Sequence, residues 1–193
     1  AYAAKIDVTW SYGANNMNVT NEYFESVAAV NKKMDRSEVG SHIWIKLEEN
    51  FSTMSEGLRL PANKTVEIDL NGHTLGRDLK QPVKNGYVIE VGKNTKLTIK
   101  GGAPLSNGHV MWEGMTRTMG TTNGGVITAG YSKNSSGGIQ ALRGSRITLS
   151  NVTIAGCATT TYGGGIRADG SNITITMNNA SVKGCLAGQD GGG

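Results

Sequence analysis

Short stretches in which apolar and polar residues alternate recur along most of the chain. Leu97–Ile99, Ile147–Leu149 and Ile173–Ile175 each place a threonine between two apolar residues. Because successive side chains of a strand point to opposite faces, this pattern predicts short β-strands with one apolar face. Glycine and polar residues separate these stretches and predict turns between the strands.

The same stretches repeat at regular intervals. In the last third of the chain, Asn151–Cys157 matches Asn179–Cys185 at an offset of 28 residues, and a glycine triplet follows each copy. Two further matches lie nearby: Gly137–Ile139 matches Gly164–Ile166 at an offset of 27, and Ile147–Leu149 matches Ile173–Ile175 at an offset of 26. Upstream, Ile43–Leu47 matches Val66–Leu70 at an offset of 23. At an offset of 50, Ile89 matches Ile139 and Leu97–Ile99 matches Ile147–Leu149. Periods of this length indicate stacked structural repeats.

Stacking would make such short strands stable, because each strand would pair in parallel with its equivalent one coil away around a continuous core. Residues 43–193 are therefore expected to form a parallel β-helix, a solenoid of about six coils with strands ~4.8 Å apart. The chain stops at a glycine triplet that, in the preceding unit, leads into Ile166 and another strand. We therefore expect this β-helix to be a truncated part of a longer one.

Residues 1–42 have a different pattern, with apolar residues at helical spacing. Thr20 is a suitable helix N-cap, Glu22 suits the first turn and Lys32 and Lys33 suit the last, around the apolar residues Phe24, Val27, Ala28 and Met34. An open β-helix end exposes its core and strand edges, so this amphipathic helix, with residues around Ile6–Trp10, is expected to cap it. The alternative is a helix that packs elsewhere or on a missing partner.

These segments resemble a known group of proteins. Ile68–Leu75, Lys96–Ile99 and the Gly-Gly-Ile and Asn-Val-Thr-Ile units that follow are similar to the N-terminal part of right-handed parallel β-helix surface proteins of the pectin-lyase-like group. The glycine-triplet units also resemble repeats of polymorphic outer-membrane proteins and adhesins. The resemblance implies an all-β fold class, a right-handed parallel β-helix solenoid with an N-terminal α-helical cap.

Composition narrows the possible classes. The chain has 28 glycines and 3 prolines among 193 residues, without the three-residue period of collagen. No apolar run approaches the ~18 residues of a membrane span. The net charge is +4, with the basic excess between Gly76 and Arg146. Such a surface attracts phosphate, uronate or sulfate polymers, although solvated lysines are the simpler interpretation. The aromatic and basic pattern of a nucleic-acid-binding protein is not present, and no cofactor is indicated.

Catalysis would need clustered carboxylates. Pectate-lyase-type chemistry uses acids that hold calcium, and inverting hydrolysis uses acids that position a water. The later units contain only Asp169 and Asp190, while Asp69 and Glu90 could lie one coil apart. Asp69 precedes an Asn-Gly turn and is expected to serve it. The chain is therefore expected not to be an enzyme.

Pro104–Thr122 interrupts the repeat and is expected to form a loop. Insertions of this kind often carry binding, so a possible binding loop contains Met111, Trp112, Met115 and Arg117. The alternative is a segment that folds back as a local cover. Trp10, Trp44 and Trp112 can stack on sugars, or Trp44 can simply cover the outer face.

Two further sets of residues follow from the repeat. Cys157 and Cys185 should lie on adjacent coils, as free thiols or as a possible disulfide. Asn151 and Asn179 should form a hydrogen-bonded ladder. Five other asparagines lie in sequons and are possible N-glycosylation sites in a eukaryotic secretory pathway: Asn18, Asn50, Asn63, Asn134 and Asn172.

Together these features predict a non-catalytic, extracellular or cell-surface module such as a stalk, an adhesin or a filament component. Its expected partners are surface glycans or proteins of a host or neighbouring cell, or further copies of the chain. Nucleic acid and a membrane span are not expected. The alternative function is a polysaccharide-active lyase or glycoside hydrolase.

Overall fold

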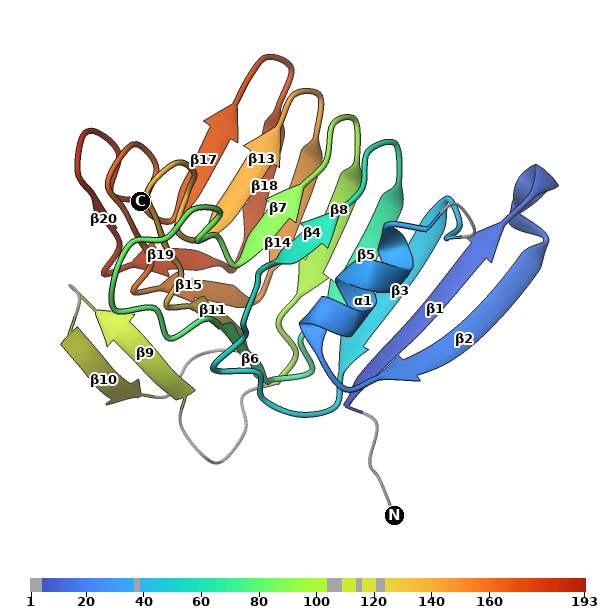
Figure 1. Ribbon diagram of the computed structural model, residues 1–193, viewed down its shortest axis with the longest axis horizontal. Helices are drawn as coiled ribbons and strands as arrows, with labels where there is room; N and C mark the ends of the chain where they lie inside the picture. The colour runs from blue at the N-terminus through green and yellow to red at the C-terminus, as the bar shows by residue number, and fades with distance from the viewer. Residues whose placement is uncertain (1–4, 37–38, 104–108, 114–115, 121–123) are drawn as a thin grey trace.

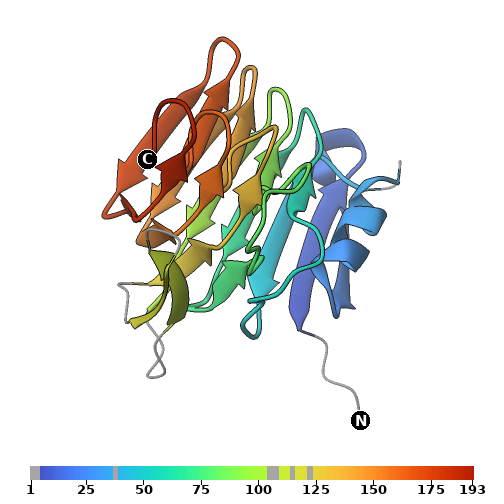
Figure 2. The same cartoon turned by 60° about the vertical axis from the view of Figure 1, so that its left-hand side comes forward.

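The structure is a computed structural model that describes residues 5–36, 39–103, 109–113, 116–120 and 124–193. Nearly half of these residues lie in short strands that follow one another side by side from the N-terminal to the C-terminal end (Figure 1 and Figure 2). Within the described part of the chain, no helix is long and apolar enough to cross a membrane.

The largest sheet has seven strands and is mixed. Along the sheet the order is β18 (Thr174–Asn178), β14 (Arg146–Ser150), β8 (Lys96–Lys100), β5 (Thr65–Asp69), β3 (His42–Leu47), β1 (Ile6–Tyr12) and β2 (Asn18–Phe24). The pairs from β18 to β3 are parallel, whereas β1 runs antiparallel to both β2 and β3. This sheet joins residues from both ends of the chain.

Three smaller sheets are parallel, and one two-stranded sheet is antiparallel. The first parallel sheet contains β19 (Ser181–Lys183), β15 (Val152–Ala155), β11 (Gly125–Thr128) and β6 (Thr74–Gly76), and the second contains β12 (Tyr131–Ser132), β16 (Ala158–Thr159) and β20 (Leu186–Ala187). The third parallel sheet contains β17 (Ile166–Asp169), β13 (Ile139–Leu142), β7 (Ile89–Val91) and β4 (Leu58–Leu60). The antiparallel sheet contains β9 (His109–Glu113) and β10 (Thr116–Gly120).

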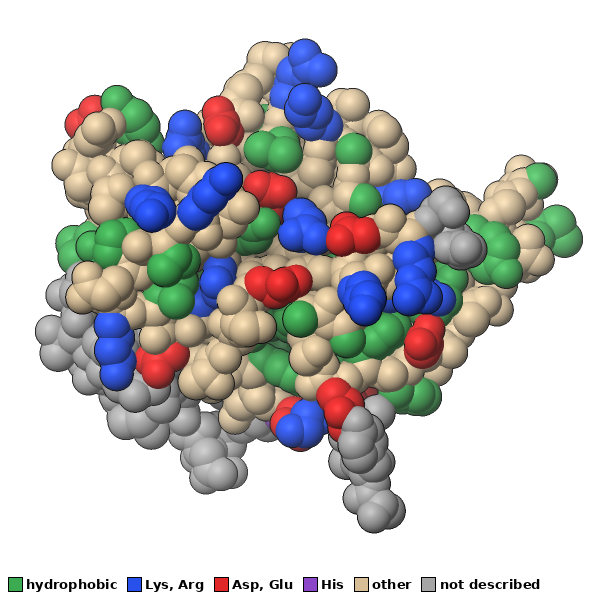
Figure 3. Space-filling model, viewed as in Figure 1, with side chains coloured by type: hydrophobic (Ala, Val, Ile, Leu, Met, Phe, Trp, Pro, Cys, Tyr) green, Lys and Arg blue, Asp and Glu red, His purple; other side chains and the backbone are tan. Residues whose placement is uncertain are grey.

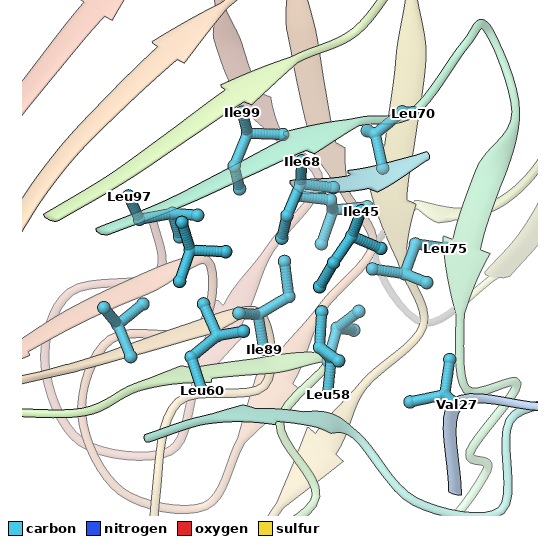
Figure 4. Close-up of a cluster of buried hydrophobic side chains, with 14 of the residues drawn as sticks. Val27, Ile45, Leu58, Leu60, Ile68, Leu70, Leu75, Ile89, Leu97 and Ile99 are labelled. Carbon is cyan, nitrogen blue, oxygen red and sulfur yellow. The ribbon is translucent and has the colours of Figure 1, made fainter. Parts of the chain in front are cut away.

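The apolar core lies between the seven-stranded sheet and the β17-β13-β7-β4 sheet. Figure 4 shows Ile68 and Ile99 on one side pointing toward Leu60 and Ile89 on the other. All four side chains are at most 1% exposed. Truncation of one such side chain to alanine costs ~2–5 kcal/mol in a packed core, so these alternating apolar positions fix which face of each strand is buried.

The expected fold class, a right-handed parallel β-helix solenoid with an N-terminal α-helical cap, is wrong. The strands form separate parallel and mixed sheets, and one α-helix is present in the described residues. The physical reason lies largely at the N-terminal end, where the antiparallel hairpin of β1 and β2 makes the largest sheet mixed.

The predicted helix is also shorter than expected. Helix α1 spans Val27–Met34, and its N-cap is Ser26, whose side chain accepts a hydrogen bond from the amide of Ala29 at 3.1 Å. Thr20 lies instead in β2, because the preceding residues pair with β1. A single 3-10 turn, η1 (Ala14–Asn16), lies in the connection between β1 and β2. The helix packs against β4 and β2, so part of the N-terminal end is covered by a hairpin rather than by a helix alone.

Most of the predicted pairings are correct, but one is displaced. Ile139 pairs with Ile166, and Thr153 pairs with Ser181, as the sequence offsets indicate. Ile147, however, pairs with Ile175 rather than with Ile173. The turn before β18 therefore contains one residue more than the corresponding turn before β14, instead of one fewer.

Candidate functional site

The outer face of the seven-stranded sheet carries a groove with a volume of about 290 Å³. Because alternate side chains of β1, β3, β5 and β8 point outward, the polar residues of these strands form rows across the sheet. The groove lies between two such rows and is lined by Asp7, Thr9, Trp44, Ile45, Lys46, Glu67, Ile68, Asp69 and Lys100.

Trp44 is the aromatic side chain that borders this groove. The imidazole of His42 stacks against the indole with ring centroids 3.7 Å apart and an angle of 19° between the planes. His42 Nε2 also lies 3.1 Å from Glu67 Oε2 on the neighbouring strand. These contacts hold the indole in one orientation, and His42 is not part of the groove lining.

Charges of alternating sign form the row beside Trp44. Across successive strands, Asp7 lies opposite Lys46, Lys46 opposite Asp69, and Asp69 opposite Lys100. Opposite charges on neighbouring strands stabilise a sheet, and they also offer both hydrogen-bond donors and acceptors to a ligand. A rigid aromatic ring beside such a row is suited to a ligand with one apolar face and many hydroxyl groups, such as a sugar.

A second groove, of about 270 Å³, lies at one end of the β4 and β7 strands. Asp35, Arg59, Glu90 and Lys93 line it together with apolar residues. Arg59 Nη2 donates to Asp35 Oδ2 at 2.7 Å, and Arg59 lies opposite Glu90 in the sheet. Burial raises the pKa of the Glu90 carboxyl, and the nearby Arg59 guanidinium only partly offsets this.

The side chain of Arg77 connects the loop that precedes β7 to the loop that precedes β4. Its Nη1 donates to the carbonyls of Asn85 at 2.9 Å and Tyr87 at 2.8 Å, and its Nη2 donates to the carbonyl of Ser55 at 3.2 Å. The side chain is buried and its Nε has no hydrogen-bond partner. Burial lowers the pKa of Arg77 and raises that of the Tyr87 hydroxyl. Three backbone carbonyls thus replace a carboxylate as the partners of a buried cation.

Asn31 on α1 connects the helix to the residues at the start of β4. Its side-chain amide donates to the carbonyl of Gly57 at 2.7 Å and to Glu56 Oε1 at 2.8 Å, and its Oδ1 accepts from the amide of Arg59 at 2.8 Å. The helix therefore fixes the start of β4, and with it the backbone that carries Arg59. In the described part of the chain, no group of three or more His, Cys, Asp or Glu side chains is placed to hold a metal ion.

The predicted binding loop is in part a β-hairpin. Met111 and Trp112 lie in β9, Arg117 lies in β10, and the backbone of Trp112 pairs with that of Arg117. Met115 lies outside the described residues. Strand β9 lies near β11 and β15, on a different side of the molecule from the seven-stranded sheet (Figure 1). Trp10 does not form a sugar platform, because it is only 3% exposed.

Cys157 and Cys185 lie next to each other as free thiols at equivalent positions of neighbouring units. Cys157 is fully buried, whereas Cys185 is partly exposed. The adjacent Cys185 thiol and burial both raise the pKa of Cys157, and the hydrogen bond with Cys157 lowers the pKa of Cys185. The expected asparagine ladder is present, because Asn179 Nδ2 donates to Asn151 Oδ1 at 2.9 Å.

The five sequon asparagines are all exposed but differ in their surroundings. Asn63 and Asn172 lie in turns with positive φ, and Asn18 begins β2. Asn50 Oδ1 accepts a hydrogen bond from the amide of Thr74 at 3.0 Å, and the Asn134 side chain bonds to Asn85 through both its amide and its oxygen. Glycosylation at Asn134 would attach the glycan to the Nδ2 that donates to Asn85 Oδ1 and would therefore disturb this hydrogen bond.

Sequence reasoning did not single out Arg59, Arg77 or Tyr87. An alignment of the Leu58–Leu60 and Ile89–Val91 stretches would have placed Arg59 beside Glu90, because both have a charged residue between two apolar ones. The 23-residue offset did place Trp44 beside Glu67, although the contact of both with His42 was not foreseen. Arg77 lies in an irregular segment without such a signal.

Comparisons with known proteins add no family to this geometry. No family model matches the chain, and neither a curated protein nor a solved structure matches it significantly.

Proposed function

We propose that the chain is a non-catalytic, extracellular or cell-surface adhesive module that binds a linear glycan on the outer face of its seven-stranded sheet. The observation that carries the proposal is the groove in which Trp44, held by His42, borders a row of alternating charges. A sheet face of this kind suits an extended polymer better than a small enclosed substrate, because residues of four neighbouring strands line the groove.

The rigidity of the sheet supports this role. The pairs from β3 to β18 share one parallel register, and the apolar side of the sheet is packed against the core. A pre-organised surface loses little conformational entropy on binding, so even modest contacts with each sugar contribute to affinity. We further propose that the chain is attached to a cell surface and recognises glycans or proteins of another cell.

Binding of the wild-type chain and of Trp44→Ala to an array of linear polysaccharides, including xylan, polygalacturonate and dextran, tests this function. Loss of the aromatic platform is expected to weaken the strongest interaction about tenfold, or about 1.4 kcal/mol. Tyr162→Ala is the matched control, since Tyr162 is an exposed aromatic residue outside the groove. Unchanged binding by Trp44→Ala, or no binding to any polysaccharide, would refute the proposal.

A second candidate is a polysaccharide-active enzyme that uses the groove beside β4 and β7. The observation that favours it is the half-buried Glu90, whose raised pKa suits a general acid, close to Arg59 and Asp35. Release of reducing ends from the same polysaccharides by the wild-type chain, abolished by Glu90→Gln, would support this function. No release above that of the Glu90→Gln variant would exclude it for the polysaccharides tested.

A further inference from the structure

Five basic side chains gather at the edge of the seven-stranded sheet where its parallel strands β5, β8 and β14 begin. Lys100 lies at the opposite end of β8. Lys96 and Arg146 begin the neighbouring strands β8 and β14 and pair directly with each other. Lys64 precedes β5, and the amide of Lys96 donates to its carbonyl at 2.9 Å. Lys93 and Arg143 lie in the adjoining turns. We call these five residues the basic ridge.

Lys93 and Arg143 lie in neighbouring turns, one before β8 and one before β14. The amide of Asn94 donates to the carbonyl of Arg143 at 3.0 Å, so the turn that follows Lys93 lies directly beside the turn that contains Arg143. Four of the five side chains are exposed, and Lys64 is half-buried. Figure 3 shows Lys and Arg side chains over the turns at the upper edge of the molecule, near the ends of β13 and β14.

None of the five side chains forms an ion pair with a described carboxylate. Two acids on neighbouring strands are engaged elsewhere: Glu67 contacts His42, and Asp169 contacts Arg167 at 3.7 Å and accepts a hydrogen bond from Gln140 at 3.0 Å. Lys93 also borders the groove that contains Glu90, without forming an ion pair there. The ridge therefore presents uncompensated positive charge.

This arrangement departs from the charge pattern of the rest of the molecule. Elsewhere, charges that face each other across strands have opposite signs, as in Lys46 with Asp69 and Arg59 with Glu90. Like charges directly opposite each other destabilise a sheet, and strands lie only ~4.8 Å apart. The residues that flank Lys96 and Arg146 directly in this row are threonines, Thr65 and Thr174, so neutral residues fit these positions. A local conflict of this kind is characteristic of a functional surface.

We propose that the basic ridge is a binding site for a sulfated linear polysaccharide, separate from the Trp44 groove. A polyanion laid across the strands would meet a cation on each of two or three successive strands and would relieve their mutual repulsion. The adjacent outward row contains Thr98, Thr148 and Thr176 beside Lys96 and Arg146, and continues on the other side to Glu67 and Trp44 of the groove. Hydroxyl groups can hydrogen-bond to sulfates and sugars, whereas single-stranded nucleic acid would favour aromatic platforms for its bases.

Calorimetric titration with a heparin dodecasaccharide at low salt tests the proposal. The ridge variant Lys93→Gln/Lys96→Gln/Arg143→Gln/Arg146→Gln should bind at least tenfold more weakly than the wild type, and binding of the wild type should weaken steeply with added salt. The control variant removes the same number of exposed positive charges elsewhere: Lys80→Gln/Lys84→Gln/Lys133→Gln/Lys183→Gln. It should remain within about twofold of the wild type.

Three results would overturn the proposal. Equal losses in the ridge and control variants would show that net charge alone attracts heparin. No heparin binding by the wild type would remove the site. Tighter binding of a single-stranded DNA of equal charge, lost in the ridge variant, would assign the surface to nucleic acid. Trp44→Ala should leave heparin binding intact, so a failure of the proposed glycan groove is distinguishable from a failure of the ridge.

A single substitution gives an independent readout. Lys96→Thr, which copies the residue at Thr65 and Thr174, should raise the midpoint of thermal unfolding while it weakens heparin binding. The stability gain follows from the removal of one like-charge pair, and the loss of binding from the removal of a contact. An unchanged or lower unfolding midpoint would contradict the argument that Lys96 is retained at a cost to stability.

Discussion

Replacement of Arg77 by methionine tests whether a buried cation without a carboxylate partner stabilises this fold. The substitution keeps an apolar stem of similar length but removes every donor from the carbonyls of Ser55, Asn85 and Tyr87. The loop between β6 and β7 would then lose its connection to the loop that precedes β4.

The magnitude follows from these three hydrogen bonds. Loss of a partner costs about 1–3 kcal/mol for a buried polar group, and the Tyr87 carbonyl bond is the most buried of the three. Relief from the desolvated charge and from the unpaired Nε of Arg77 returns part of this energy. We therefore expect a net decrease of about 3 kcal/mol in the free energy of unfolding.

Urea denaturation followed by circular dichroism measures this change, and hydrogen exchange of residues 77–88 reports on the loop. Arg36→Met, at an exposed arginine, serves as the control and should change stability by less than about 0.5 kcal/mol. A loss below about 1 kcal/mol for Arg77→Met, with unchanged exchange in the loop, would refute the reasoning.

Two further predictions concern titratable groups. Because the folded state raises the pKa of Glu90 above its ordinary value of 4.5, wild-type stability should fall as pH rises through the interval between these values. Glu90→Gln should therefore stabilise the chain at pH 7, by up to about 1 kcal/mol, and lose this advantage in acid; an equal effect at both pH values in urea melts would contradict the assignment. Iodoacetamide should alkylate Cys185 well before Cys157, since Cys157 is fully buried with a raised pKa; equal rates by mass spectrometry would show that the two thiols are equally accessible.

The pairing of the strands was largely predictable because their inward residues are apolar and alternate. The offsets of 23 and 50 residues correctly placed Ile45 beside Ile68 and Ile99 beside Leu149. The last pairing was wrong by two residues because a shift of two keeps every side chain on the same face. Both Ile173 and Ile175 satisfy the apolar pattern, so the pattern alone does not distinguish the two registers.

The N-terminal segment was less predictable because its edge strand lacks an apolar face. All of β2 except Phe24 is exposed, so alternation gives no signal over most of its length. The helical spacing of Phe24, Val27 and Met34 is real only from Ser26 onward, where the side chain caps the helix. Main-chain pairing with β1 determines the conformation of the preceding residues, and in this exposed strand few buried side chains mark the pairing in the sequence.

The candidate sites also differ in how far the sequence predicts them, according to whether their residues lie in repeated strands. The row containing Lys96 and Arg146 and the row containing Trp44 lie in repeated strands, so their neighbours follow from the offsets. Arg77 lies in a segment that repeats nowhere, and its three partners are main-chain carbonyls that no residue pattern marks. Side-chain chemistry is thus predictable here only where strand pairing transfers it from one unit to the next.

The groove and the basic ridge occupy one rigid surface. Lys96 and Lys100 begin and end the same strand, so the two rows that they belong to are about 13 Å apart along it at ~3.3 Å per residue. This separation corresponds to a few sugar units of an extended polymer. A polymer with uncharged and sulfated segments that runs along the strands, rather than across them as at the ridge alone, can therefore contact both sites at once, and a rigid spacing raises the effective concentration of the second contact. Because the sheet holds this spacing through its main-chain hydrogen bonds, selectivity for long over short polymers can arise without a deep pocket.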